Sequence, residues 1–158
     1  MFETNDGSYL LLNYAIRHME EVVRNIMTRE VITIEENRTV RDAAELMTAN
    51  QISSLIVEKN QNAIGIISER DFVRKICSKD LLPSKILVSD IMSSIAQTAE
   101  PDTPLEVAVQ RMINHKIRRL PVLEKGKIVG IVTVTDLAKE LRKIVLHEEV
   151  LSDLLDSQ

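Results

Sequence analysis

Apolar residues in the first half of the chain follow the period of a strand and then the period of a helix. Val31 to Ile34 is a β-branched run that predicts a short strand. Thr39-x-x-Asp42 resembles a capping box and predicts the start of a helix. The helical period gives that helix an apolar face made of Val40, Ala43, Ala44 and Met47.

A predicted hairpin and a second helix complete this unit. Leu55 to Val57 is an apolar run typical of a buried strand, and Asn60 to Asn62 has turn chemistry. Ala63 to Ser68 predicts the partner strand of the hairpin. A helix is expected to follow through Phe72, Val73 and Ile76. The order is therefore strand, helix, strand, strand, helix.

The same unit occurs again 65 residues further along the chain. Gly65-Ile66-Ile67-Ser68-Glu69-Arg70-Asp71 recurs as Gly130-Ile131-Val132-Thr133-Val134-Thr135-Asp136. Without a gap, the offset also aligns Ile26-Met27 with Ile91-Met92, Thr33 with Thr98, Ala43 with Ala108, Met47 with Met112, Ile52 with Ile117, Leu55 with Leu120 and Val57 with Val122. In the second copy Thr103-Pro104-x-Glu106 predicts a helix with Thr103 as its N-cap. Glu124 to Lys127 predicts the second hairpin turn.

Four segments are expected along the chain. Leu12, Ile16, Met19 and Val23 predict a leading amphipathic helix, so residues 1–23 form an N-terminal segment. Residues 24–84 and 85–145 form the two modules, with the boundary near Pro83, and residues 146–158 form a helical tail. One module of this size buries only about 60% of its unfolded surface. The two modules are therefore expected to pack together and to leave clefts between equivalent edges.

Composition narrows the class of protein. The 158 residues carry a net charge of -4 and only 3% aromatic residues, which disfavours nucleic-acid binding. The single cysteine, Cys77, fits a reducing compartment. The apolar run Tyr9 to Leu12 is too short for a membrane span and lacks the form of a signal peptide, so we expect a cytoplasmic protein with no membrane contact. The three histidines share no ligand spacing and no catalytic constellation is present, so neither a metal nor an enzyme activity is expected.

The repeated motif Gly-apolar-apolar-Ser/Thr-x-x-Asp is the element with functional chemistry. Its glycine lets another backbone or a ligand approach closely. The hydroxyl lies beside helix N-terminal amides, which attract phosphate. An aspartate three residues later can accept two hydrogen bonds, such as those of ribose hydroxyls. The same pattern is also an ordinary helix cap, and both roles are compatible.

These features resemble tandem CBS domains, the Bateman module. The resemblance rests on the two motifs, on Asn25-Ile26-Met27 and Asp90-Ile91-Met92, and on Ile117 to Val122, and it covers about residues 24 to 145. It implies an α+β fold of two tandem β-α-β-β-α modules packed with pseudo-two-fold symmetry. It also implies a regulatory sensor that binds AMP, ADP, ATP or S-adenosylmethionine between the modules, forms a homodimer and acts on a partner protein that the sequence does not name.

The resemblance implies two composite clefts. One combines Ile66, Ser68, Arg70 and Asp71 with Gln97, Thr98, Arg118 and Arg119. The other combines Thr133, Thr135 and Asp136 with Ile32, Thr33, Ser53 and Ser54. The aspartates would hold ribose, and Arg118 or Arg119 would contact phosphate.

The two clefts are not expected to be equal. Ser53 and Ser54 stand where the second module has Arg118 and Arg119, so the first cleft is predicted to bind phosphate more strongly. The Arg70 side chain is able to fold onto the Asp71 carboxylate and occupy this cleft in place of a ligand. Three other functions remain open on the sequence: a ligand-free interaction scaffold, part of an enzyme, and a nucleic-acid binder acting through Lys116 and the arginine pair.

Overall fold

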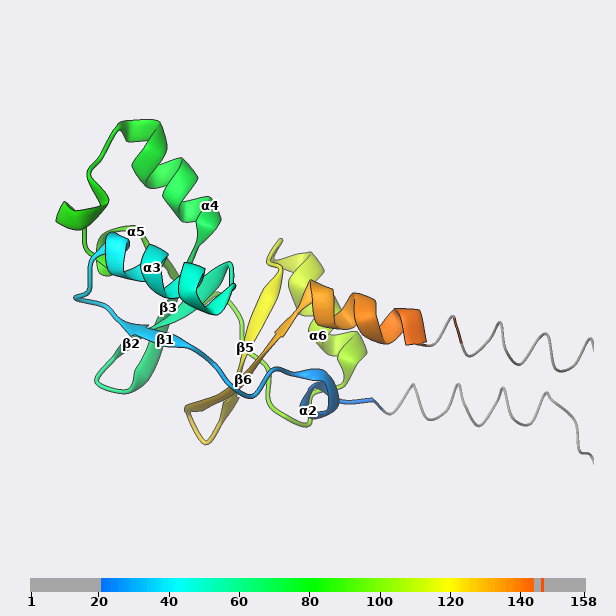
Figure 1. Ribbon diagram of the computed structural model, residues 1–158. Helices are drawn as coiled ribbons and strands as arrows, with labels where there is room; N and C mark the ends of the chain where they lie inside the picture. Colours follow the sequence, from blue (N-terminus) through cyan, green and yellow to red (C-terminus); the bar gives the residue numbers. More distant parts are fainter. Residues whose placement is uncertain (1–20, 144–145, 147–158) are drawn as a thin grey trace, which may run out of the picture.

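The computed structural model describes residues 21–143 and 146 (Figure 1). The predicted leading helix and the predicted helical tail fall mostly outside these residues. In the described part, helices and strands alternate in the order expected from the sequence. No helix within residues 21–143 combines the length and the apolar character needed to cross a bilayer.

The first half forms the predicted unit around a small sheet. Strand β1 (Thr33–Glu35) runs parallel to β2 (Ser54–Lys59), which pairs antiparallel with β3 (Asn62–Ser68). Helix α3 (Val40–Asn50) connects β1 to β2. After β3 the chain enters α4 (Glu69–Asp71), continues as the π-helical segment η1 (Phe72–Ile76), and ends in the 3₁₀ turns η2 (Cys77–Lys79) and η3 (Pro83–Lys85). The predicted first strand began two residues too early, at Val31.

The capping box of α3 is confirmed. The Asp42 amide donates to Thr39 Oγ1 at 3.1 Å, and the Thr39 amide donates to Asp42 Oδ2 at 3.0 Å. The backbone and hydroxyl hydrogen bonds from Thr39 lower the pKa of Asp42. Val40, Ala43 and Met47 face the core, whereas Ala44 is only partly buried.

The second half repeats the unit with a different helix start. Helix α6 (Leu105–Asn114) precedes the hairpin of β5 (Arg119–Glu124) and β6 (Lys127–Thr133), and residues 134–143 are helical. The prediction of Thr103 as N-cap was wrong, since Pro104 holds that position without a side-chain hydrogen bond. The Thr103 hydroxyl instead accepts the Glu100 amide at 2.9 Å, which closes the turn before the helix.

Both hairpins turn tightly on two residues of positive φ, the geometry of a type I′ turn. Asn60 and Gln61 have φ of 51° and 63°, and Lys125 and Gly126 have φ of 50° and 79°. This turn fixes the register that puts Leu55 to Val57 and the equivalent residues of β5 in the core. Strands β3 and β6 lie close together where the two halves meet.

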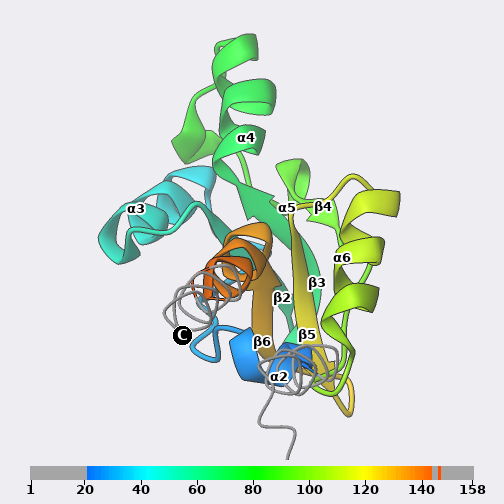
Figure 2. The same ribbon diagram turned by 90° about the vertical axis from the view of Figure 1, so that its right-hand side faces the viewer.

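Short connectors cross between the halves. Helix α2 (Val23–Ile26), which precedes the first unit, packs into the second core, where Val23 and Met27 join Ala108, Leu120 and Val132. Helix α5 (Val88–Ile91), which precedes the second unit, packs into the first core with Val40 and Leu55. Figure 2 shows α2 at the foot of the β5–β6 hairpin. Each core is therefore completed by a segment that precedes the other unit.

The motif glycines lie where these connectors cross the hairpins. Strand β4 (Ser93–Ser94) pairs with β3 at Gly65 and Ile66, and Thr28 forms the equivalent bridge to Ile131. A Cβ on Gly65 would lie 2.6 Å from the sulfur of Met92 and 3.0 Å from the Ser93 carbonyl oxygen. A Cβ on Gly130 would lie 2.5 Å from the sulfur of Met27. The two glycines therefore permit the close approach of the connecting segments, at Met92 and Ser93 for Gly65 and at Met27 and Thr28 for Gly130.

Candidate functional site

Two cavities open where the halves meet. We call them the Asp71 cleft, of about 450 Å³, and the Asp136 cleft, of about 500 Å³. Both volumes fall in the range of small-molecule sites. Ser53, Arg118 and Arg119 line both clefts, so the two cavities adjoin at these side chains.

The Asp71 cleft contains most of the residues predicted for it. Seven of the eight line it: Ile66, Ser68, Arg70, Asp71, Gln97, Arg118 and Arg119. Thr98 is absent from the lining, and its carbonyl oxygen accepts from Arg111 Nη1 at 2.6 Å. The motif did not indicate Glu69, Arg74, Lys75, Ser93, Ser94, Ala96 and Ile117, and Lys116, considered only under the disfavoured nucleic-acid alternative, also lines this cleft.

The Asp71 carboxylate is fixed by hydrogen bonds to one oxygen and an ion pair to the other. The backbone amide and the hydroxyl of Ser68 donate to Asp71 Oδ2 at 2.9 and 2.8 Å, which is the cap anticipated from the motif. Lys75 Nζ lies 2.8 Å from Asp71 Oδ1 and also donates to the Ile91 carbonyl oxygen at 2.6 Å. The ion pair of Asp71 is therefore made by Lys75 in η1, whereas the sequence had suggested Arg70.

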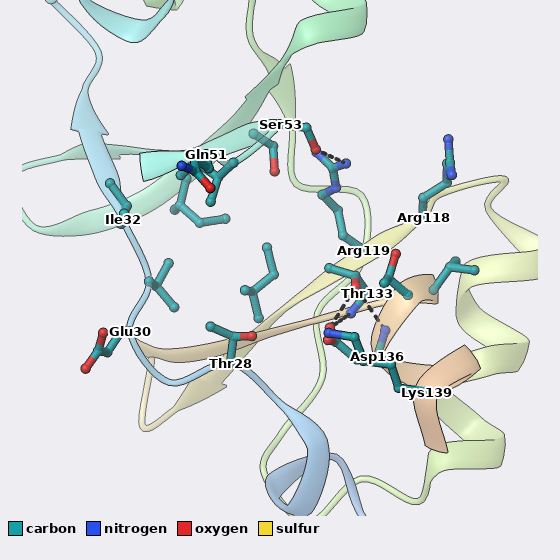
Figure 3. A pocket seen from close by; sticks show the side chains of 17 residues that line it. Thr28, Glu30, Ile32, Gln51, Ser53, Arg118, Arg119, Thr133, Asp136 and Lys139 are labelled. Atoms are coloured by element: carbon teal, nitrogen blue, oxygen red, sulfur yellow. Dashed lines mark hydrogen bonds between the residues drawn. The ribbon is translucent and has the colours of Figure 1, made fainter. Parts of the chain in front are cut away.

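The Asp136 cleft has the same design. Six of its seven predicted residues line it: Ile32, Ser53, Ser54, Thr133, Thr135 and Asp136. Thr33 is absent from the lining and pairs with Ile56 of β2 within the sheet. The amide and hydroxyl of Thr133 donate to Asp136 Oδ2 at 2.9 and 2.7 Å, as drawn in Figure 3. Thr28, Glu30, Gln51 and Lys139 are lining residues that the motif alone did not indicate.

This arrangement is a duplicated fold with equivalent clefts at its centre, and known proteins share it. The family model described as the CBS domain matches residues 23–78 and again residues 88–143. The chain belongs to the CBS-domain family. The two structural halves are accordingly two CBS modules, and the fold class expected from the sequence is confirmed.

Relatives of the CBS chain are similar along most of its length. The CBS domain-containing protein YhcV of Bacillus subtilis is 33% identical over 116 residues, which cover 73% of this chain and 82% of YhcV. An uncharacterised protein of Methanopyrus kandleri is 38% identical over 117 residues, again 73% of this chain but 60% of that protein. The chain thus spans less than two thirds of this second relative. The solved hexameric CBS-CP12 protein from bloom-forming cyanobacteria has a TM-score of 0.71 and 32% identity, over 76% of this chain and 67% of its own.

Charge distinguishes the two clefts of this CBS pair. Six cationic side chains line the Asp71 cleft against two acidic ones, Glu69 and Asp71; the cations are Arg70, Arg74, Lys75, Lys116, Arg118 and Arg119. The Asp136 cleft has three cations, Arg118, Arg119 and Lys139, against Glu30 and Asp136. Glu140, at the position equivalent to Lys75, is buried and paired with Lys143 Nζ at 2.7 Å. The Asp71 cleft therefore attracts anions more strongly.

Arg119 is the cation of the site that has an enclosed donor without a partner among the described residues. Its Nη2 donates to Ser53 Oγ at a long 3.5 Å, and its enclosed Nη1 has no hydrogen-bond partner among the described residues (Figure 3). Burial, followed by the positive charges of Arg118 and Arg70, lowers the pKa of Arg119. A partly desolvated guanidinium with an unused donor is stabilised by an anion that enters the cleft.

Proposed function

We propose that the chain is a regulatory protein, not an enzyme, that binds AMP, ADP, ATP or S-adenosylmethionine in the clefts between its CBS modules. The observation that carries the proposal is the Asp71 cleft, where six cations and a hydroxyl–carboxylate pair line one cavity of about 450 Å³. A nucleotide offers a phosphate for the cations, ribose hydroxyls for the carboxylate and an adenine for the apolar wall.

Each part of such a ligand has a matching part of the cleft. Arg118 and Arg119 would bind phosphate, since guanidinium groups give it two parallel charge-assisted hydrogen bonds. Asp71 would accept ribose hydroxyls through Oδ1, with Lys75 moving from that oxygen to the phosphate. Ile66 would pack on the adenine ring, and Gln97 lies on the opposite module where backbone groups are within reach of the base. In the Asp136 cleft, Ile32 and Asp136 would take the equivalent roles.

The proposed assembly rests on exposed apolar side chains. Val73, Ile113 and Leu141 are 62%, 64% and 60% exposed on their helices, and we propose that a second copy of the chain covers such apolar side chains in a homodimer. The similarity to a hexameric CBS-CP12 protein supports self-association within the family. A cytoplasmic location, where adenine nucleotides are abundant, fits this sensor role, and the regulated target would be a partner protein.

A ligand-free interaction scaffold is the second candidate. The observation that favours it is that both carboxylate oxygens of Asp71 already have partners within the protein. Oδ2 accepts from Ser68, and Oδ1 pairs with Lys75. In that case the clefts would be structural joints between the modules. Nucleotide binding separates the two functions.

The test is a thermal-shift panel of AMP, ADP, ATP, S-adenosylmethionine and GTP on the full chain. A ligand at a hundredfold excess over its dissociation constant stabilises the native state by about 2.7 kcal/mol. For a chain of this size the gain corresponds to a rise of roughly 5 to 11 °C in melting temperature. The matched control is Asp71→Asn with Asp136→Asn in one chain, which should not respond. If no adenosine compound at millimolar concentration shifts the transition of the wild-type chain, the scaffold function is the correct one.

A further inference from the structure

One guanidinium stands at the junction of the two clefts. Arg119 begins β5 of the second module and reaches toward Ser53, which precedes β2 of the first (Figure 3). It lines the Asp71 cleft and the Asp136 cleft alike. Arg118 also lines both but is exposed, so solvent screens its charge, whereas the Nη1 of Arg119 is enclosed by protein.

The pseudo-symmetry does not duplicate this side chain. The residue equivalent to Arg119 is Ser54, which lines the Asp136 cleft alone. Two clefts of equivalent design are therefore served by a single enclosed guanidinium. Its only described side-chain partner is the Ser53 hydroxyl at 3.5 Å, a contact too weak to hold it toward either cleft.

We propose that Arg119 is shared between the clefts and binds a phosphate in only one of them at a time, so that AMP in one cleft weakens the binding of AMP in the other. The inference rests on the proposed nucleotide binding. Among the described residues, Nη1 is the one enclosed side-chain donor without a hydrogen-bond partner, and a guanidinium that turns this donor toward one phosphate points it away from the other. Two phosphates near one cation also repel each other in a partly desolvated site. Such coupling acts equally in both directions.

The test is calorimetry with AMP on the full chain. The wild-type chain should bind two molecules with unequal affinity. When the Asp71 cleft, the tighter of the two, is disabled by Asp71→Asn, the Asp136 cleft should bind AMP at least about fivefold more tightly than the wild-type chain binds its second molecule. Ile66→Trp, which fills the Asp71 cleft without removing the Asp71 cap, serves as a second disabling variant.

The Arg119→Ala variant tests whether this guanidinium causes the coupling between the clefts. Without the shared guanidinium, the second binding event should have the same affinity whether the first cleft is occupied or disabled. Arg118→Ala is the comparison variant: it should weaken both binding events, since Arg118 is also assigned to phosphate, but should leave the fivefold difference between them in place. Arg119→Lys, which keeps the charge but offers one nitrogen, should reduce the difference and replaces Arg119→Ala if that variant does not fold.

Two results would overturn the inference. One is a second wild-type event with the affinity of the single-cleft variants, and the other is a difference that persists in Arg119→Ala. Either leaves the proposed function intact, because AMP still binds. A wild-type chain that gives no heat with AMP and no thermal shift with any adenosine compound refutes the proposed function itself.

Discussion

Met27 crosses Gly130 so closely that a Cβ on the glycine would lie 2.5 Å from the methionine sulfur. The two residues are more than a hundred positions apart in the chain. Their contact ties the segment that leads into the first CBS module to the hairpin of the second. The contact of Met92 with Gly65 ties the other connector in the same way.

Gly130→Ala should therefore destabilise the fold, by about 1–3 kcal/mol, as overpacked sites do. Chemical denaturation measures the loss. The double variant with Met27→Ala should lose less stability than the sum of the two single changes, because the sulfur that meets the new methyl group is removed. A Gly130→Ala variant as stable as the wild-type chain would contradict the crossing geometry.

The Asp71 cleft should be the tighter phosphate site. Six cations line it against three in the Asp136 cleft, and one additional charge-assisted hydrogen bond contributes about 1.5–3 kcal/mol, so a preference of tenfold or more is expected. Calorimetry should show that Asp71→Ala removes the tight AMP event and Asp136→Ala a weaker one. A tight event that survives Asp71→Ala and disappears in Asp136→Ala would show that the Asp136 cleft is the stronger site and would contradict this prediction.

Arg119→Ala should weaken AMP and ATP but leave adenosine nearly unchanged. The side chain has a free Nη1 for phosphate and no adenine or ribose role in the proposed site. Competition binding with adenosine and AMP gives the two affinities side by side. Equal losses for both compounds would mean that Arg119 supports the shape of the cleft and does not contact phosphate.

Lys75→Met should change the preference between nucleotide and nucleoside. It removes one cation from the Asp71 cleft and releases Asp71 Oδ1, which Lys75 contacts at 2.8 Å. We expect weaker AMP binding and tighter adenosine binding, measured by calorimetry. Lys139→Met, in the other cleft, is the control and should leave the tight event unchanged. A parallel fall in both affinities would show that Lys75 acts only on the fold, through its hydrogen bond to Ile91.

Asp42 should stabilise the protein in a pH-dependent way. The hydrogen bonds from Thr39 lower the pKa of Asp42, so the folded chain favours its carboxylate. That contribution is fully present above the unfolded value of about 3.9 and is lost as the pH falls through the lower folded value. Asp42→Asn should therefore melt earlier than the wild-type chain at pH 7, and the gap should close in acid. Glu45→Gln, on the exposed face of α3, is the control and should show a smaller gap.

Local chemistry accounts for what the sequence predicted well. The capping box of Thr39 and Asp42 and the two hairpin turns each depend on residues a few positions apart, and the hairpin turn is found in both copies of the repeat. Val23 and Met27 were different. Their apolar pattern shows that they are buried, but the pattern is the same whichever core they join, so the crossing of the connectors could not be predicted.

The cleft residues that depend on local sequence were predicted, and those that depend on tertiary structure were not. Residues fixed by the motif, such as Ser68 and Asp71, lie on the cleft walls as expected. Thr33 and Thr98 were placed by the family resemblance alone, and both lie outside the lining, although their neighbours Ile32 and Gln97 line the clefts. Lys75 was missed because its contact with Asp71 depends on the helical turn that follows the motif.

The crossed connectors make the two modules inseparable as building blocks. A chain cut between residues 84 and 85 would leave the first core without Val88 and Ile91 and the β3 strand without its β4 neighbour. The other fragment would lose Val23 and Met27, which fill the second core. Neither half is then an autonomous folding unit, because each hydrophobic interior would open and an unpaired strand edge invites aggregation. Heat or denaturant should accordingly unfold both halves in one transition. A destabilising substitution in either module should disturb the structure of both clefts.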